Sequence, residues 1–154
     1  MIKYADTMIC FQEIPDEISL SFSITNCPNN CPGCHSPYLR EGRGIPVKEV
    51  LQDKLNKNKY KVTCILFLGG DDVKQIRELK ECLWLCKEAG YKTALYSGFD
   101  EIREDLIPLL DYYKVGSYKE SLGGLKSSHT NQRLYKIVNN KLEDITYKFW
   151  EKHC

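Results

Sequence analysis

Alternating apolar and polar positions open the chain. Residues 7–13 and 18–25 are separated by a short proline-containing acidic segment, and Leu20, Phe22 and Ile24 occupy every second position of the later stretch. A period of two is typical of half-buried strands. The pattern therefore predicts a β-hairpin at the N-terminal end of the chain.

The middle of the chain alternates predicted strands with predicted helices. Residues 62–68 form a nearly continuous apolar run, typical of a strand buried on both faces, and a helix is expected from Pro46 to Asn58 before it. Helical spacing over residues 73–89 ends before a further strand at 91–96. A strand, a helix and a strand with a crossover of about twenty residues predict parallel pairing.

The remaining elements are shorter. A helix over residues 100–110 is limited by Pro108, and a strand is expected at 112–118. Residues 133–138 and 145–150 fit short strands around an Asn-Asn-Lys turn, and the last of them also fits a helix. We expect one α/β domain over residues 1–154, which is too short for a complete eight-fold β/α barrel of about 250 residues.

Composition excludes several classes of protein. With 22 Lys and Arg against 21 Asp and Glu, the net charge is +1, so no basic field for nucleic acid is expected. Residues 1–6 have no apolar core of a signal peptide, and no run of about 18 apolar residues occurs. We expect a cytoplasmic chain without a membrane segment, in which eight cysteines indicate metal or redox chemistry.

Three cysteines gather on one short stretch. Cys27, Cys31 and Cys34 fall within eight residues, and the prolines and glycine among them exclude an ordinary helix. Thiolates that converge on a loop suit zinc, copper(I) or iron–sulfur. Structural zinc sites and electron-transfer clusters normally have four protein ligands, so three ligands leave one position open.

The sequence leaves the fourth ligand undecided. The spacing alone is compatible with an open iron–sulfur cluster, with a zinc site closed by a fourth side chain, or with coincidence. The candidates for that side chain are His35, Cys64, Cys82, Cys86 and Cys154. Cys10, and also Cys82 and Cys86 on their predicted helix, fit packed core positions better than ligands.

Unusual segments follow each predicted parallel strand. These are the cysteine loop and residues 69–72, 97–99 and 116–121, which we expect at one edge of the sheet, where α/β proteins bind ligands. Gly69 and Gly70 allow a ligand close to the backbone, and Asp71 or Asp72 can accept a charged amine. The same four residues also fit a plain strand-to-helix turn with an N-cap.

The cysteine spacing resembles that of the radical S-adenosylmethionine enzymes. Cys31-Pro32-Gly33-Cys34 is similar to the ending found in activating proteins of anaerobic ribonucleotide reductase, although Gly33 stands where the superfamily usually has an aromatic residue. Residues 69–72 resemble the Gly-Gly-Glu-Pro segment that holds the methionine amino group, with aspartates in place of the last two residues.

Two further segments share this resemblance. Tyr96-Ser97-Gly98-Phe99 is similar to the segment near the methionine and ribose in those activating proteins, and Asn131-Gln132-Arg133 to their Asn-Gln-Arg element. His129 beside it fits loop surface. The resemblance extends from about Ser19 to Val138.

The resemblance implies a fold and a reaction. It implies a partial β/α barrel of the radical S-adenosylmethionine type, in which Cys27, Cys31 and Cys34 hold a [4Fe–4S] cluster whose free iron binds S-adenosylmethionine. The residues implied at the cofactor are Gly69, Gly70, Asp71, Ser97 and Gly98. Reductive cleavage then gives a 5′-deoxyadenosyl radical that removes a hydrogen atom from a glycine of anaerobic ribonucleoside-triphosphate reductase. The implied electron donor is a flavodoxin or ferredoxin, and no acid–base side chain is implied as catalytic.

Two alternatives remain. Another radical S-adenosylmethionine enzyme, such as a pyruvate formate-lyase-type activase or one acting on a small molecule, would share the cluster and differ at the substrate face. A non-catalytic zinc or iron–sulfur module belongs to a different class. Iron analysis and spectra with and without S-adenosylmethionine separate the two classes.

Overall fold

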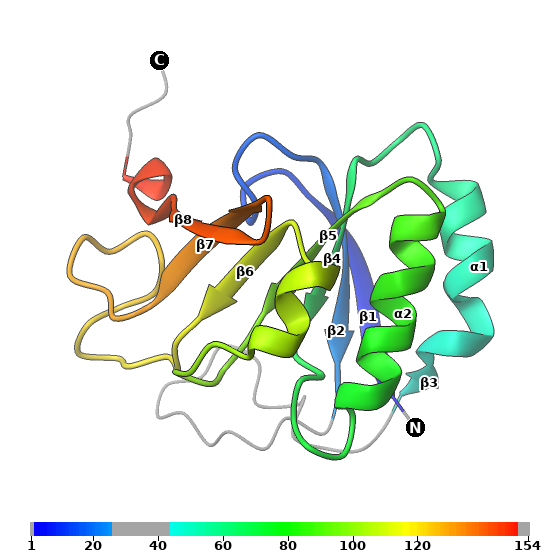
Figure 1. The fold of residues 1–154 in the computed structure, drawn as a ribbon, viewed down its shortest axis with the longest axis horizontal. Helices are drawn as coiled ribbons and strands as arrows, with labels where there is room; N and C mark the ends of the chain where they lie inside the picture. Colours follow the sequence, from blue (N-terminus) through cyan, green and yellow to red (C-terminus); the bar gives the residue numbers. More distant parts are fainter. Residues whose placement is uncertain (1, 26–43, 151–154) are drawn as a thin grey trace.

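One open mixed sheet organises the part of the chain that the computed structural model describes, residues 2–25 and 44–150. Its order is β3-β1-β2-β4-β5-β6-β7-β8 (Figure 1). The strands are β1 Lys3–Cys10, β2 Ser19–Ile24, β3 Ile45–Pro46, β4 Cys64–Leu68, β5 Lys92–Tyr96, β6 Tyr112–Val115, β7 Arg133–Val138 and β8 Lys141–Asp144. The α/β class is confirmed, and the sheet does not close on itself.

The N-terminal hairpin is confirmed. β1 pairs antiparallel with β2 from Tyr4 opposite Ile24 to Cys10 opposite Ser19, with an irregularity between Tyr4 and Asp6. The first strand lies earlier than predicted, because the pairing partner of β2 is Lys3–Cys10 and not residues 7–13.

The parallel centre of the sheet is confirmed as well. β4 pairs in parallel with β2 on one side and with β5 on the other, and β6 pairs in parallel with β5. Helix α2, Ile76–Glu88, connects β4 to β5, and helix α1, Val47–Lys57, precedes β4. The carboxyl ends of β2, β4, β5 and β6 therefore share one edge, which lies toward the lower side of Figure 1.

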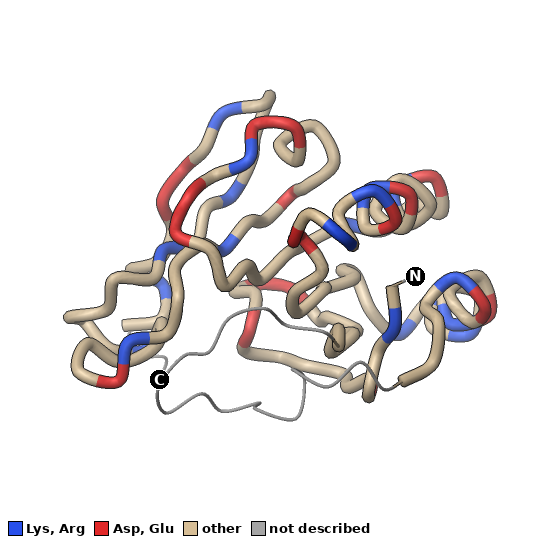
Figure 2. The backbone as a smooth tube through the Cα atoms, turned by 90° about the horizontal axis from the view of Figure 1, so that it is seen from below, with Lys and Arg blue, Asp and Glu red and all other residues tan. Residues whose placement is uncertain are grey.

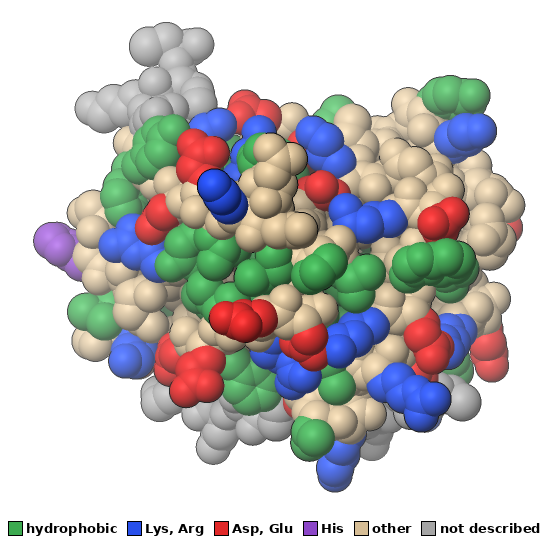
Figure 3. Space-filling view, viewed as in Figure 1, with side chains coloured by type: hydrophobic (Ala, Val, Ile, Leu, Met, Phe, Trp, Pro, Cys, Tyr) green, Lys and Arg blue, Asp and Glu red, His purple; other side chains and the backbone are tan. Residues whose placement is uncertain are grey.

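A helical layer covers one face of the sheet. Phe22 of β2 stacks on Phe67 of β4 with ring centroids 5.5 Å apart, and Tyr4 meets Phe22 edge-on. These rings pack with Leu51 of α1 and Leu83 of α2 in one core cluster. On the outside of this layer, apolar side chains are interspersed with charged ones (Figure 3).

The other face of the sheet is covered too. Leu66, Ala94 and Tyr112 pack there with Ile14, from the connection between β1 and β2, and with Ile145. Burial on both faces explains why β4 is a continuous apolar run. It also explains why the serines that alternate with apolar residues in β2 are buried instead of exposed.

Several predicted boundaries were wrong. Residues 100–110 contain only a short 3-10 helix, η2 Glu104–Leu109, because Pro108 interrupts the α-helical ladder. The strand predicted at 112–118 stops at Val115, before Gly116 with φ +114°. For residues 145–150 the sequence left a strand or a helix open, and the structure has the 3-10 helix η3, Thr146–Phe149.

The turn predicted after β7 is confirmed. Asn139 and Asn140 have φ of 52° and 61°, the left-handed values that a tight hairpin turn requires. β8 follows at once and pairs antiparallel with β7.

Charges of both signs are interspersed over the described backbone, in agreement with the net charge of +1 (Figure 2). No helix in the described ranges has the length and apolar character needed to cross a membrane.

Candidate functional site

The edge of the sheet beyond β4 has a backbone that only glycine adopts readily. Gly69 and Gly70 have φ of +99° and +101°, and a Cβ on Gly70 would lie 3.0 Å from Cδ1 of Ile2. The amide of Gly69 donates to the carbonyl of Tyr96, so the turn stays attached to β5. The two glycines thus leave backbone without side chains at this edge.

Asp71 follows as a buried acid. Its exposed fraction is 4%, and Ser97 Oγ donates to Asp71 Oδ2 at 2.5 Å. Burial raises the pKa of the Asp71 carboxyl above its ordinary value, although the Ser97 hydroxyl opposes the rise. Arg103 also opposes it from a distance, but the guanidinium forms its ion pair with Asp105. The Asp71 carboxylate is therefore short of positive charge.

Ser97 links Asp71 to a buried lysine on the next strand. Lys114 of β6, with an exposed fraction of 7%, donates from Nζ to the carbonyl oxygens of Ser97 at 3.0 Å and Gly116 at 2.9 Å. Nζ also lies 5.7 Å from the ring centroid of Tyr96. Lys114 was not predicted as a site residue from the sequence, although a lysine inside the otherwise apolar strand β6 could have indicated it.

The segment after β5 is held in place by the segment after β6. Ser97 Oγ accepts from the amide of Phe99 at 3.0 Å, which closes the turn around Gly98. The carbonyl of Phe99 accepts from the amide of Gly116 at 2.7 Å, and Asp100 Oδ1 accepts from the amide of Ser117 at 2.9 Å. The predicted convergence of these segments is confirmed.

Two residues of the Asn-Gln-Arg segment reach this edge. Asn131 Nδ2 donates to the carbonyl of Ser117 at 3.1 Å, and Gln132 Nε2 donates to that of Gly116 at 3.2 Å. Arg133 points elsewhere, because its guanidinium lies 3.6 Å from Asp144 and 5.9 Å from the ring of Trp150. Asn131 and Gln132 thus hold the loop after β6.

The predicted metal ligands Cys27, Cys31 and Cys34 lie outside the described residues, as do His35 and Cys154. The two ends of the segment that carries the cysteines are described. A Cβ on Gly44 would lie 3.3 Å from Cγ2 of Thr25 and would collide with the carbonyl of Tyr4. The segment therefore leaves and rejoins the sheet at one place, the carboxyl end of β2.

Three of the candidates for a fourth ligand are core residues. Cys64, Cys82 and Cys86 are fully buried, and burial raises the pKa of Cys64 and Cys82 to about 12. Cys64 starts β4, so it lies roughly 16 Å from the Gly69 end at the usual strand rise. Cys82 and Cys86 belong to α2 and pack into the main core cluster. In residues 2–25 and 44–150, no three His, Cys, Asp or Glu side chains are grouped to bind a metal.

Buried polar atoms without partners gather near the same edge. Asp72 Oδ1, Gln75 Oε1 and Asn131 Oδ1 are buried and accept no hydrogen bond in the described part of the chain; Ser19 Oγ, at the amino end of β2, is also buried without a partner there. Such atoms are rare in folded proteins and require an explanation. A bound polar ligand is one explanation.

A cavity of about 380 Å³ lies beside Tyr96, on the sheet face opposite α1 and α2. It is bordered by the connection between β1 and β2 and by the loop before β7, with Gln132 and Phe149 among its walls. Gln132 is the wall residue that also bonds to the loop after β6, whereas Gly69, Gly70, Asp71 and Ser97 do not line this cavity.

A family model described as "4Fe-4S single cluster domain" matches residues 18–138, which include the three cysteines, the Gly-Gly-Asp segment and Ser97. The chain belongs to this family. Neither the curated proteins nor the solved structures gave a match. The family indicates an iron–sulfur cofactor.

The residues present fit such a cofactor. Three thiols stand on one segment whose ends are fixed at the carboxyl end of β2, while Cys64, Cys82 and Cys86 are committed to the core. Because these three buried thiols are unavailable as a fourth ligand, the cysteine segment fits the iron–sulfur cofactor that the family indicates. His35 and Cys154, the other candidates for a fourth ligand, lie outside the described residues.

Proposed function

We propose that this chain is a radical S-adenosylmethionine enzyme that binds its cluster through Cys27, Cys31 and Cys34. One observation carries the proposal: Asp71 is a buried carboxyl with a raised pKa, beside a glycine backbone, at the sheet edge from which the cysteine segment departs. A buried acid short of positive charge is a binding site for a cation. The ammonium group of the methionyl end of S-adenosylmethionine is such a cation.

Each residue of the edge has a role in this proposal. Asp71 accepts hydrogen bonds from the ammonium group, and Gly69 and Gly70 leave backbone available to the ligand. Lys114 supplies positive charge for the ligand carboxylate. Ser97, in the turn around Gly98, fixes the positions of Asp71 and Lys114 relative to each other, because its hydroxyl bonds to Asp71 and its carbonyl oxygen accepts from Lys114.

The cofactor supplies the difficult chemistry. When bound, the reduced cluster provides one electron that converts S-adenosylmethionine to methionine and a 5′-deoxyadenosyl radical. The protein orients the ligand and excludes water. An ammonium group paired with Asp71 compensates the charge of a carboxylate that burial destabilises. This pairing favours binding of the methionyl end of the ligand.

We propose that the substrate is a backbone glycine of anaerobic ribonucleoside-triphosphate reductase, with a flavodoxin or ferredoxin as electron donor in the cytoplasm. The open sheet supports a protein substrate, because an incomplete barrel of the radical S-adenosylmethionine type leaves one side of the site accessible to a polypeptide. The Cys-Pro-Gly-Cys ending and the Asn-Gln segment that holds the loop after β6 support this choice of partner.

Deuterium transfer tests the proposal. The reductase is prepared with deuterated glycine and mixed anaerobically with the reconstituted protein, reductant and S-adenosylmethionine. We expect deuterium in 5′-deoxyadenosine and a glycyl radical spectrum on the reductase, with neither product from a Cys31→Ser variant. Cleavage without transfer contradicts this partner and directs the test to pyruvate formate-lyase or a small molecule. A cluster-loaded protein that never cleaves S-adenosylmethionine contradicts the enzyme assignment and supports a binding module.

A further inference from the structure

Gln75 joins two segments that are far apart in the sequence. It lies directly before α2, its exposed fraction is 4%, and Nε2 donates to the carbonyl oxygen of Thr25 at 3.0 Å across fifty positions of sequence. Thr25 is the last described residue before the cysteine segment. The amide of Gln75 therefore bonds to the point where that segment begins.

The backbone around Gln75 is itself fixed. Its amide donates to the carbonyl of Asp72 at 3.0 Å, and its carbonyl accepts from the amide of Leu79 at 3.0 Å, in the first turn of α2. Asp72 follows Asp71 directly. The position of Gln75 is thus determined by the Gly-Gly-Asp segment on one side and by a packed helix on the other.

Thr25 is fixed on its other side by β1. Its amide donates to the carbonyl of Lys3 at 3.0 Å, its hydroxyl donates to the same carbonyl at 3.4 Å, and its exposed fraction is 2%. With the Thr25 carbonyl also bonded to Gln75, both backbone polar groups of Thr25, the last described residue before the cysteine segment, are hydrogen-bonded.

Packing alone does not account for a glutamine here. Gln75 Oε1 is buried and accepts no hydrogen bond from the described residues, so the amide is only half satisfied. An apolar side chain of similar size would fill the space without burying that oxygen. The property that an apolar side chain lacks is the donor to Thr25.

We propose that Gln75 is a positioning residue for the cysteine segment, which sets the direction in which the chain leaves β2 relative to Asp71. Cys27 lies two residues after Thr25, and Asp71 lies four residues before Gln75. A single hydrogen bond thus couples the metal-binding segment to the acid proposed to bind the ligand. The identity of the metal rests on the proposed function, whereas the coupling requires only that the cysteines bind one.

Metal release measures this coupling directly. The anaerobically reconstituted full chain is exposed to a chelator, and loss of the bound metal is followed by absorbance and metal analysis. We expect roughly tenfold faster release from Gln75→Leu and from Gln75→Glu, the factor for one hydrogen bond of ordinary strength. We also expect the electron paramagnetic resonance signal of the reduced cluster to shift in both variants.

Two control variants separate positioning from general stability. Gln52→Leu changes an exposed glutamine of α1 whose side chain bonds only within that helix, to Asn56, and leaves metal release and the spectrum unchanged. Leu79→Ala removes a buried side chain one turn further along α2 and lowers the unfolding temperature without accelerating release.

The outcomes are decisive in either direction. Release rates and spectra of the Gln75 variants equal to wild type, or equal to Leu79→Ala at matched stability, overturn the inference. A cluster indifferent to S-adenosylmethionine, or zinc in place of iron, contradicts the proposed function only, because accelerated release from the Gln75 variants still supports the positioning role.

Discussion

Each end of the parallel sheet buries a carboxyl group, and the two groups differ in their hydrogen-bond donors and in the direction in which their pKa is shifted. At the amino end, Glu17 has an exposed fraction of 8% and accepts from Thr63 at 2.7 Å, Tyr112 at 2.7 Å and Lys92 at 2.9 Å. Burial raises the pKa of Glu17, but these three bonds outweigh it and the net pKa lies below the ordinary value. At the carboxyl end, Ser97 is the one side-chain donor to Asp71 among the described residues, and burial raises the pKa of Asp71.

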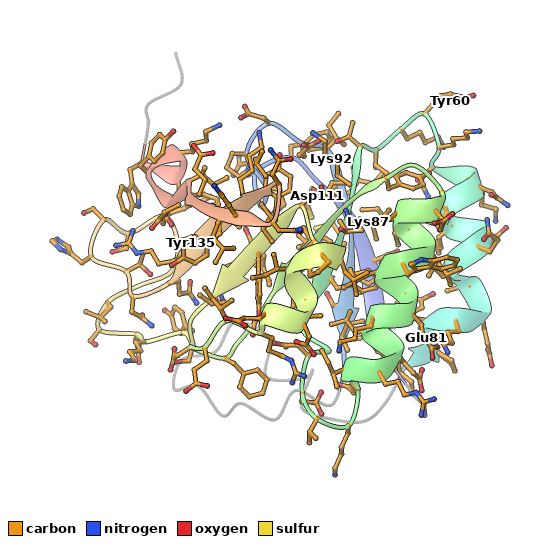
Figure 4. The ribbon with its side chains drawn as sticks, in the orientation of Figure 1. Tyr60, Glu81, Lys87, Lys92, Asp111 and Tyr135 are labelled. Atoms are coloured by element: carbon orange, nitrogen blue, oxygen red, sulfur yellow. The ribbon has the colours of Figure 1, made fainter. Side chains whose placement is uncertain are left out.

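The difference separates an acid that stabilises the fold from the acid that we propose to bind the ligand. A carboxylate surrounded by donors stabilises the fold and has no capacity left for a ligand. Other satisfied charges lie at the amino end as well, where Lys87 and Asp111 form an ion pair at 3.0 Å near Lys92 (Figure 4). The Asp71 carboxylate lacks such a partner among the described side chains, so the free-energy cost of burying its charge is not compensated there.

The largest expected effect follows from neutralising Asp71. In the reconstituted protein, Asp71→Asn should weaken S-adenosylmethionine binding by about a hundredfold, the factor for a charge-assisted hydrogen bond of 2–3 kcal/mol. The free energy of unfolding should stay the same or rise, because the variant removes a buried charge that the fold disfavours. Anaerobic calorimetric titration and urea unfolding measure the two quantities.

Asp72→Asn makes the same charge change one residue away and distinguishes the two acids of this edge, because the Asp72 side chain is less buried although its Oδ1 also lacks a partner among the described residues. It should weaken binding much less than Asp71→Asn. A larger loss of affinity from Asp72→Asn than from Asp71→Asn would assign the ligand role to Asp72 and contradict the contrast between Asp71 and Glu17.

Glu17→Gln should lower stability and leave ligand affinity unchanged, the opposite of Asp71→Asn. The free energy of unfolding should fall by about 2 kcal/mol, since hydrogen bonds to a buried charged group from Lys92 and Tyr112 are weakened. S-adenosylmethionine affinity should not change, because the carboxyl lies at the far end of the sheet. Reduced affinity with unchanged stability would contradict the structural role of Glu17.

A smaller effect is expected at Ser97. Ser97→Ala removes the hydroxyl that bonds to Asp71 and the amide of Phe99. It should raise the pKa of Asp71 further and weaken ligand binding by about 1 kcal/mol, the usual value of one hydrogen bond. The matched change is Ser117→Ala, whose hydroxyl bonds to Asp100 Oδ1 and not to Asp71. Equal losses from both variants would contradict a specific role for Ser97.

The dependence of stability on pH should differ in sign between the two acids. Glu17, with a lowered pKa, stabilises the fold above about pH 4.5, and this contribution is lost as pH falls through its folded-state pKa. Asp71, with a raised pKa, destabilises the fold as pH rises above about 3.8. At neutral pH, wild type should therefore be more stable than Glu17→Gln and less stable than or equal to Asp71→Asn. Both differences in the free energy of unfolding should shrink at acidic pH. Urea unfolding from pH 3 to 7 measures both, and a common sign would contradict the assignment.

Local pattern was sufficient to predict much of the fold. The period of two in β2 predicted the hairpin. The apolar run of β4 predicted the parallel centre of the sheet, and the glycines after it marked the shared edge. These features could be predicted because each depends on residues close together in the sequence. The 3-10 helix η2 was mistaken for an α-helix, since Pro108 changes the hydrogen-bond ladder without altering the apolar spacing.

The residues that sequence reasoning missed depend on distant partners. Glu17 is recognised as structural only through Thr63, Lys92 and Tyr112, which lie 46, 75 and 95 positions away. Gln75 is noticed only through Thr25, fifty positions away. Neither side chain has a local pattern that reports these contacts, so only the folded arrangement identifies them.

Electron paramagnetic resonance of the reduced, reconstituted protein before and after addition of S-adenosylmethionine tests the central claim most directly. We predict a [4Fe–4S] signal that changes with S-adenosylmethionine in wild type and in Glu17→Gln, and that changes only at much higher concentration in Asp71→Asn. A signal that S-adenosylmethionine leaves unchanged, or a response equally strong in Asp71→Asn, would contradict the assignment of this edge as the ligand site.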